Sequence, residues 1–335
     1  MGFKRYIALR LVTMVAVVFI LLTFIFFAIH IIPGDPVASM VGEHASEEYI
    51  EQIRHELGLD KPLIIQYFDY IAGVFSGYLG KSIVLQTDVS VMIWQRAGVT
   101  IQLAVMAWVV STIMGVVVGR YSAQKAGSLQ DHSIHAATLF LYSVPVYVLG
   151  ILGQLIFGVY LGILPIFGTQ SPLTRVPTIT GMIMIDTLLA GDLPGFGDAF
   201  LHFLLPALVL SAHYTAITAR LTRNETMKEM RRAFCLLAQA KGLDNKTITV
   251  RHAFRNAILP VVTLIGMQAG TLLTGSVLIE TVFSLNGLGS LLYTAASMRD
   301  YILTQGVVTV FVLVTSFVGL IIDVSYYFLD PRVRY

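Results

Sequence analysis

Gly80-Lys81-Ser82 has the residue types that end a phosphate-binding loop, in which lysine contacts the phosphates and serine binds Mg²⁺. Such a loop also needs a glycine five residues before its second glycine, because the backbone must pass close to the phosphates. That position is Phe75. We therefore interpret the match as coincidental and expect no nucleotide site in this segment.

No other pattern in the sequence points to covalent or metal chemistry. There is no G-x-S-x-G nucleophile motif, no H-E-x-x-H zinc motif and no cluster of Cys and His residues. The single cysteine, Cys235, cannot form an internal disulfide or a paired-cysteine metal site. We therefore predict a non-catalytic chain without a metal site or a cofactor of its own.

The composition indicates a membrane protein. Of the 335 residues, 56% are hydrophobic and 13% are charged, and the mean hydropathy is +0.77. Soluble domains carry about 25% charged residues, so long stretches of this chain must avoid water. A net charge of +2 without a dense basic run argues against nucleic acid as a partner.

Six stretches are apolar enough to cross a bilayer, which takes about 20 helical residues because lipid cannot satisfy backbone polar groups. They are residues 11–32, 99–118, 136–160, 203–219, 258–279 and 301–329. The first is too long for a signal peptide, and no cleavage site follows it. A shorter stretch, 179–190, contains Asp186 and is expected to be interfacial or re-entrant. The predicted fold class is an all-α integral membrane protein with six transmembrane helices.

The distribution of Lys and Arg predicts the orientation of these helices. Sixteen lie on the side of the N-terminus and six on the other side, so both termini should be cytoplasmic. Residues 33–98 then form an acidic extracytoplasmic insertion between the first two spans. Within it, Ser46 followed by Glu47 and Glu48 predicts a capped helix over 46–57. The insertion could dock a partner or cap the membrane core.

Three polar side chains within the spans are candidates for lining a translocation path: Gln154, His213 and Gln268. Neutral hydrogen-bonding groups could solvate a polar solute without trapping it; alternatively, neighbouring helices satisfy them. An ion-coupled carrier usually needs ionisable groups near the bilayer midplane, whereas Asp323 lies close to the end of the last span. The driving force for transport should therefore come from another protein.

Small residues recur at four-residue spacing in the pairs Gly115/Gly119, Gly158/Gly162 and Gly266/Gly270. On a helix each pair lies on one face and permits close approach of a second helix. Prolines at 145, 206 and 260 are expected to bend or interrupt the spans. These features indicate helix packing, or helices that can move between two arrangements.

The loop 220–257 between the fourth and fifth spans contains a sharp corner. Residues 233–240 favour a helix, Lys241-Gly242 supply a basic last turn and a left-handed cap, and Asp244 can cap a second short helix. Four apolar side chains need a surface to bury against: Phe234, Leu236, Leu237 and Leu243. The pattern fits a docking element, and an ordinary folded-back loop would explain it equally well.

Several blocks resemble, in order, the dipeptide/oligopeptide group of ABC transporter permeases. The most specific is Ala238-Gln239-Ala240-Lys241-Gly242-Leu243, followed by His252-Ala253-Phe254-Arg255-Asn256-Ala257-Ile258-Leu259-Pro260. Other matching blocks occur at residues 33–36, 57–62, 79–82, 202–207, 280–289, 299–301 and 330–335. The resemblance covers essentially the whole chain.

The resemblance implies the transmembrane permease subunit of a binding-protein-dependent importer for peptides. Such a subunit would form the translocation path with a second, similar permease, rest on two cytoplasmic ATPases that bind ATP and Mg²⁺, and receive solute from an extracytoplasmic binding protein. It would lie in the cell membrane and hold no cofactor. The implied regions are 1–32 with the first span, the subdomain 33–98, the transmembrane core 99–329 and the cytoplasmic tail 330–335.

The resemblance also assigns the ATPase contact to the corner, at Ala238, Ala240, Lys241, Gly242, Leu243 and Asp244. One departure concerns the start of the first corner helix, where the family commonly has an acidic residue. This chain has Arg232 and Ala233 there, so an ion pair with the ATPase would lack its acidic partner.

Other functions are compatible with parts of the sequence. The same machinery could import an oligosaccharide or a metal chelate, because nothing in the sequence identifies the cargo. A self-sufficient channel or ion-driven carrier would transport solute without ATP. An intramembrane hydrolase would need a nucleophile and a base at membrane depth, and the sequence offers no such pair.

Overall fold

The computed structural model describes residues 3–31, 46–56, 58–82, 84–172 and 178–329, and these parts contain helices and no strand. Five helices are long and apolar enough to cross a membrane, or six if one bent pair counts as a single span. The predicted all-α fold with transmembrane helices is confirmed at this level. Blocks 33–36 and 330–335 of the resemblance lie outside the described residues.

Most long helices extend beyond the predicted apolar stretches. They are α1 (Phe3–Ile31), α5 (Val89–Gln124), α9 (Leu193–Met230), α12 (Phe254–Val282) and α14 (Tyr301–Leu329). Before α12, α11 (Asn245–Thr247) and η2 (Ile248–Ala253) form one continuous run with it. This run and α9 have 38 residues each, or about 57 Å of helix, against an apolar bilayer core of about 30 Å. Both are therefore longer than a perpendicular crossing of the bilayer core requires.

The predicted span 136–160 is sharply broken. It consists of α6 (Leu129–Ser143), α7 (Val146–Gly153) and η1 (Gln154–Tyr160), and the two helical parts differ in direction by 103°. Pro145 caps α7, and Val144 before it is extended, with ψ of 129°. A proline disfavours helical geometry in the preceding residue, which explains the position of the break. The predicted interfacial stretch 179–190 contains the short helix α8 (Ile183–Leu189).

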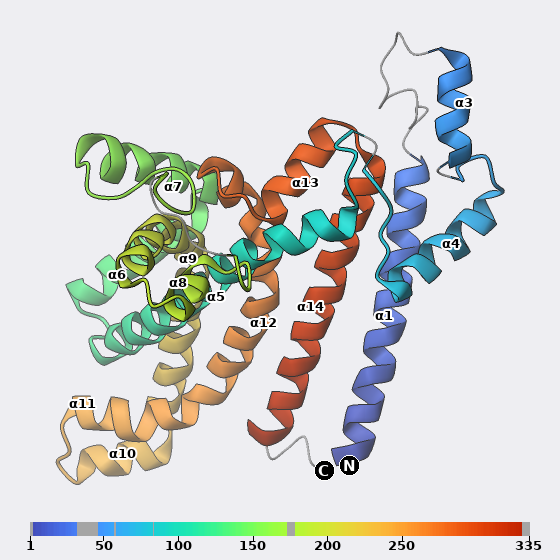
Figure 1. The fold of residues 1–335 in the computed structure, drawn as a ribbon. Coiled ribbons are helices and arrows are strands. Elements are labelled where there is room, and N and C mark those ends of the chain that lie inside the picture. Colours follow the sequence, from blue (N-terminus) through green and yellow to red (C-terminus); the bar gives the residue numbers. More distant parts are fainter. Residues whose placement is uncertain (1–2, 32–45, 57, 83, 173–177, 330–335) are drawn as a thin grey trace.

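The first helix begins and the last one ends at the same end of the molecule. The Tyr6 hydroxyl donates a 2.8 Å hydrogen bond to the Asp323 carbonyl, and Arg10 forms a 3.2 Å ion pair with the Asp323 carboxylate. Helices α10 (Ala233–Ala240) and α11 also lie at this end, as Figure 1 shows. Asp323 therefore has a cationic partner within the fold.

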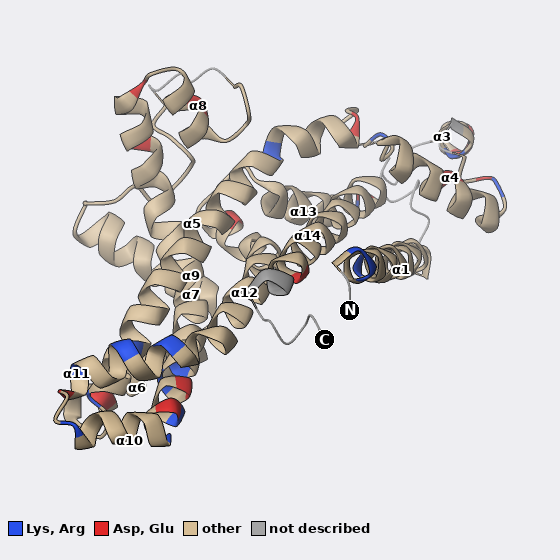
Figure 2. Ribbon diagram, turned by 90° about the horizontal axis from the view of Figure 1, so that it is seen from below, with Lys and Arg blue, Asp and Glu red and all other residues tan. Residues whose placement is uncertain are grey.

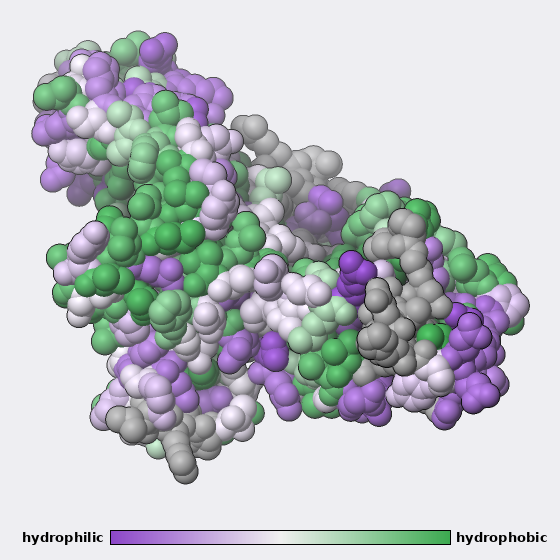
Figure 3. Space-filling view, turned by 90° about the horizontal axis from the view of Figure 1, so that it is seen from above, coloured by the Kyte–Doolittle hydropathy of each residue, from purple (hydrophilic) through white to green (hydrophobic). Residues whose placement is uncertain are grey.

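The opposite end carries α3 (Glu47–Glu56) and α4 (Leu63–Ser76), both from the insertion 33–98 (Figure 1). The Ser46 hydroxyl accepts a hydrogen bond from the Tyr49 N–H at 3.3 Å, so the predicted capped helix is confirmed. Broad hydrophobic surface covers the half of the molecule with α6 and α7, between hydrophilic borders (Figure 3). Such a surface suits contact with lipid or with another apolar helix.

The close packing of α5 on α9 depends on glycine. A Cβ added to Gly119 would collide with the Ala219 carbonyl oxygen, and one added to Gly115 would lie 2.6 Å from the Thr218 Cβ. The predicted small-residue contact is therefore confirmed for this pair. A Cβ added to Gly270 would meet nothing within 4 Å, so Gly270 permits no close approach within the described chain.

A buried carboxylate fastens the other end of α5 to two helices. The Glu280 side chain of α12 accepts hydrogen bonds from the Thr100 hydroxyl of α5 and the Ser276 hydroxyl, both at 2.8 Å. It also accepts hydrogen bonds from the backbone N–H groups of Gly289 at 2.7 Å and Ser290 at 3.0 Å, in the first turn of α13 (Leu288–Ser297). A Cβ on Gly287 would collide with this carboxylate, which explains the glycine.

We expect Gly119→Ala to lower the thermal unfolding temperature of the purified protein in detergent by several degrees. The added methyl group overpacks the α5–α9 contact, at a cost of about 1–3 kcal/mol. Gly270→Ala is the matched control, because its methyl group enters open space in another long helix. Retention of the monodisperse size-exclusion peak after heating measures the effect, and equal curves for wild type and Gly119→Ala would contradict this account.

Candidate functional site

The corner formed by α10 and α11 lies at the charged end of the molecule. Figure 2 shows that Lys, Arg, Asp and Glu gather on α10, α11 and the adjoining part of α9, while the long helices elsewhere are nearly free of charge. Helix α9 leads into this corner, and the run Asn245–Val282 leads out of it. The corner is therefore the link between two of the candidate spans.

One face of α10 packs against the protein itself. Cys235 and Ala238 are buried against Ile248 and Ala253 of η2. Burial, together with the nearby Glu229 carboxylate, raises the pKa of the Cys235 thiol, which therefore stays neutral. Ala238 thus faces inward, unlike the other five residues assigned to the ATPase contact, which are exposed: Ala240, Lys241, Gly242, Leu243 and Asp244.

The turn after α10 has the hydrogen-bond pattern of a Schellman cap. The Leu243 N–H donates to the Ala238 carbonyl at 3.3 Å, and the Gly242 N–H donates to the Gln239 carbonyl at 2.9 Å. Gly242 has φ of +82°, a left-handed conformation that is costly for residues with a Cβ. The predicted helix over 233–240 and its left-handed cap are confirmed.

Asp244 begins the second half of the corner. Its carboxylate accepts a hydrogen bond from the Thr247 N–H at 3.1 Å, so the predicted cap of α11 is confirmed. Hydrogen bonds from Thr247 hold the pKa of the Asp244 carboxyl below its usual value, and it is therefore ionised at neutral pH. The next residue, Asn245, donates its amide N–H to the Gln124 carbonyl at 3.0 Å, which ties the corner to the end of α5.

The outer face of the corner is apolar and exposed. It consists of the side chains Phe234, Leu236, Leu237 and Leu243. We call these four residues the apolar outer face. The two interpretations of the loop thus apply to different sides: α10 folds back on η2 with one face, and the other face is available to a partner.

A buried ion pair joins the spans just beside the corner. Arg223 of α9 donates two hydrogen bonds to Asp131 of α6, from Nε and Nη2, both at 2.7 Å. The same carboxylate accepts the Ser122 hydroxyl at 2.5 Å and the Gly127 N–H at 3.0 Å, at the end of α5 and in the following turn. The three helices α5, α6 and α9 are therefore fastened to one another at this end.

Arg232, which stands where the family commonly has an acidic residue, is engaged within the chain. Its Nη2 lies 3.1 Å from Glu229 Oε1 in the last turn of α9. This ion pair lies at the junction between the end of α9 and the start of α10. The positive charge at this position is therefore partly neutralised by the chain itself.

The three candidates for the translocation path occupy separate places. Gln154 donates its amide N–H to the carbonyls of Ile166 and Val282, both at 2.9 Å. Gln268 is buried and accepts the Thr218 hydroxyl at 3.1 Å, and His213 stacks on the Tyr142 ring at 4.7 Å. No hydrogen bond or ring contact joins the three within the described ranges. Their place on a path remains a prediction, while both glutamines have partners in the fold.

The segment Gly80-Lys81-Ser82, which resembles the end of a phosphate-binding loop, has a structural role in a turn. The Ser82 hydroxyl is buried and donates to the Asp300 carboxylate at 2.5 Å, and Lys81 forms an isolated β-bridge with Asp88. The serine hydroxyl is thus already used within the fold. Among the described residues there is also no group of three or more His, Cys, Asp or Glu side chains that could hold a metal ion.

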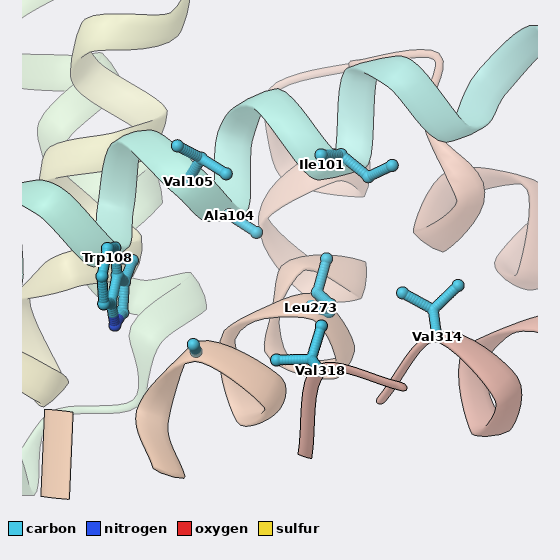
Figure 4. Close-up of a pocket in the computed structure, with 8 residues that line it drawn as sticks. Ile101, Ala104, Val105, Trp108, Leu273, Val314 and Val318 are labelled. Atoms are coloured by element: carbon cyan, nitrogen blue, oxygen red, sulfur yellow. The ribbon is translucent and has the colours of Figure 1, made fainter. Parts of the chain in front are cut away.

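Two cavities differ in chemistry. The first, of about 330 Å³, lies between α5, α12 and α14 and is lined by apolar side chains (Figure 4). Its only indole N–H, on Trp108, donates to the Ile265 carbonyl at 2.8 Å, which leaves the lining suited to hydrocarbon. The second, of about 220 Å³, has a polar lining that includes Arg96. Arg96 is not among the site residues predicted from sequence, although an arginine within a long apolar helix is itself a signal of a functional site.

Comparison with known proteins covers nearly the whole chain. Residues 115–335 match the family model "Binding-protein-dependent transport system inner membrane component", and residues 3–104 match the N-terminal model of such membrane components. The di/tripeptide transport system permease protein DppB of Pseudomonas aeruginosa is 36% identical over 331 residues, which is 98% of each chain.

Two further relatives are similar over comparable lengths. The dipeptide transport system permease protein DppB of Escherichia coli is 39% identical over 319 residues, or 94% of each chain. The glutathione transport system permease protein GsiC of Pectobacterium atrosepticum is 33% identical over 333 residues, or 99% of each chain. The chain therefore belongs to the family of binding-protein-dependent transport system inner membrane components.

Proposed function

We propose that this chain is a permease subunit of an ATP-driven, binding-protein-dependent importer for peptides. The observation that carries the proposal is the capped corner with its apolar outer face, placed between two 38-residue helical segments. Relatives named for dipeptides, di/tripeptides and glutathione support peptides as the cargo. An oligosaccharide or a metal chelate is less well supported, because none of these names points to either.

The corner transmits force from a cytoplasmic ATPase. Its apolar outer face enters a groove of the ATPase, and Ala240, Lys241, Gly242, Leu243 and Asp244 surround the contact. The inward-facing Ala238 permits the close packing of α10 on η2. When two ATPase subunits close on ATP and Mg²⁺, the corner moves, and α9 and the run Asn245–Val282 carry the displacement into the spans.

The remaining parts of the proposal concern the partners and the orientation. A second, similar permease completes the translocation path, to which Gln154, His213 and Gln268 contribute. A solute-binding protein docks on the acidic insertion 33–98. Both termini are cytoplasmic, in agreement with the α1 start and the α14 end, which lie at the same end of the molecule as the corner (Figure 1). The chain performs no catalysis, and its partners bind and hydrolyse ATP.

We expect Gly242→Val to uncouple ATP hydrolysis from peptide uptake. A β-branched residue with φ of +82° strains the cap by about 1–2 kcal/mol and shifts the corner in the ATPase groove. In proteoliposomes containing the assembled complex, we expect ATP hydrolysis to continue while peptide uptake falls at least about tenfold.

Gly191→Val provides the control for this substitution. Gly191 is also left-handed, with φ of +71°, and its added Cβ likewise meets nothing within 4 Å. It lies in the turn between α8 and α9, away from the corner. Unchanged uptake with Gly242→Val, or an equal loss with both variants, would count against the coupling role of the corner.

We expect Leu237→Asp to weaken attachment of the ATPases to the permease. Leu237 is 58% exposed, so the substitution leaves the packing of α10 on η2 intact and places a charge on the apolar outer face. Co-purification of the ATPase subunits with the permease measures the effect. Gln239→Asp adds the same charge to an exposed polar position of α10, and equal retention of the ATPases by both variants would contradict the proposed contact.

A further inference from the structure

Arg96, near the outer end of α5, is a cation without a partner among the described residues. It lies about two turns after the start of the helix at Val89 and is half-buried. Arg96 forms no ion pair or hydrogen bond with any residue in the described ranges. Ionisable groups within membrane helices are costly, and those that persist usually serve a ligand or a partner charge. The arginine thus has unused hydrogen-bonding capacity.

Arg96 borders a cavity of about 220 Å³ that is also lined by residues 169–170, by side chains between 178 and 186, and by Asn286. Amide and hydroxyl groups from three parts of the chain share the lining with it: Gln95, Gln170, Thr178 and Asn286. These groups can donate and accept hydrogen bonds. The cavity therefore combines one cation with neutral polar groups.

The acidic residue in the lining is already satisfied. Asp186 is buried, and its carboxylate accepts four hydrogen bonds, from the N–H groups of Ile179, Thr180 and Gly181 and from the Thr180 hydroxyl. Burial opposes ionisation, yet these hydrogen bonds hold the pKa of Asp186 below its usual value, and the group is charged. Asp186 thus organises the wall of the cavity and forms no ion pair with Arg96.

A second unused donor lies deeper on the same helix. Gln102 is six residues after Arg96, and its amide oxygen accepts the Met184 N–H at the start of α8 at 3.1 Å. Its amide nitrogen is buried and has no hydrogen-bond partner in the described part of the chain. This buried amide nitrogen and the Arg96 guanidinium are therefore two donors on α5 that the described fold leaves unused.

We propose that this cavity is a solute subsite in which Arg96 binds the C-terminal carboxylate of the transported peptide. The planar guanidinium matches a carboxylate with two parallel hydrogen bonds, and the surrounding amides and hydroxyl receive the polar groups of the terminal residue. The cavity volume suits one terminal residue rather than a whole oligopeptide. This inference rests on the proposed import of peptides and adds the group by which the permease recognises them.

The test measures equilibrium binding of radiolabelled dialanine and of dialanine amide to the assembled complex in nanodiscs, without binding protein. We expect the wild type to bind the free acid more tightly than the amide. Arg96→Gln should reduce this preference about tenfold, by weakening acid binding alone, and Arg96→Lys should retain part of it because the positive charge remains. Arg54→Gln, on the surface of α3, is the control and should behave as wild type.

Equal binding of acid and amide to the wild type, or an unchanged preference in Arg96→Gln, would overturn the proposal. If Arg96→Gln changed only the binding of anionic lipid to the complex, and not that of the peptide, the site would instead be assigned to a lipid phosphate. ATP-dependent uptake of dialanine by the wild-type complex with its binding protein is measured in parallel. Uptake without an acid preference would refute the subsite alone, whereas absence of uptake would refute the import of peptides as well.

Discussion

The Asp131–Arg223 ion pair is the contact on which the arrangement of the helices beside the corner depends. The carboxylate is 1% exposed, and removing one partner of such a pair costs about 3–5 kcal/mol because it leaves a buried, uncompensated charge. The pair prevents α6 and α9 from sliding past each other where α9 enters the corner. In the proposed coupling, this ion pair lets the small helix α10 act on several spans, although α10 packs on only a few residues itself.

The other end of α5 is fixed by a different polar contact. Glu280 brings α12, α5 and the start of α13 together, and hydroxyl or backbone groups supply all its hydrogen bonds. Since lipid offers no hydrogen-bond partners, such a group must be satisfied inside the protein. With Gly115 and Gly119 holding α9 close between these points, α5, α9 and α12 can move as one body. Beyond the 103° break between α6 and α7 the chain still contacts that body, since Gln154 donates to the Val282 carbonyl at the end of α12.

The sequence was informative where local rules decide the structure. The caps at Ser46, Gly242 and Asp244 depend on a few neighbouring residues, and each was predicted correctly. The break at Pro145 was predicted only as a general disturbance, because the apolar run continues through it and periodicity alone cannot give an angle. The contacts of Gln154 and Gln268 depend on residues far apart in the chain. Their partners could therefore not be read from sequence spacing.

The role of Arg96 follows from comparison with the other arginines near the membrane. Arg10, Arg223 and Arg232 each lie within 3.2 Å of a carboxylate, whereas Arg120 and Arg220 lie over the rings of Phe254 and Tyr142. Asp186 lines the same cavity as Arg96, yet backbone N–H groups and a hydroxyl satisfy it instead. If Arg96 served only to hold the fold together, this carboxylate would be its natural partner. Its separation from the acid leaves a cation for a carboxylate that arrives from outside and must leave again, which a permanent ion pair would prevent.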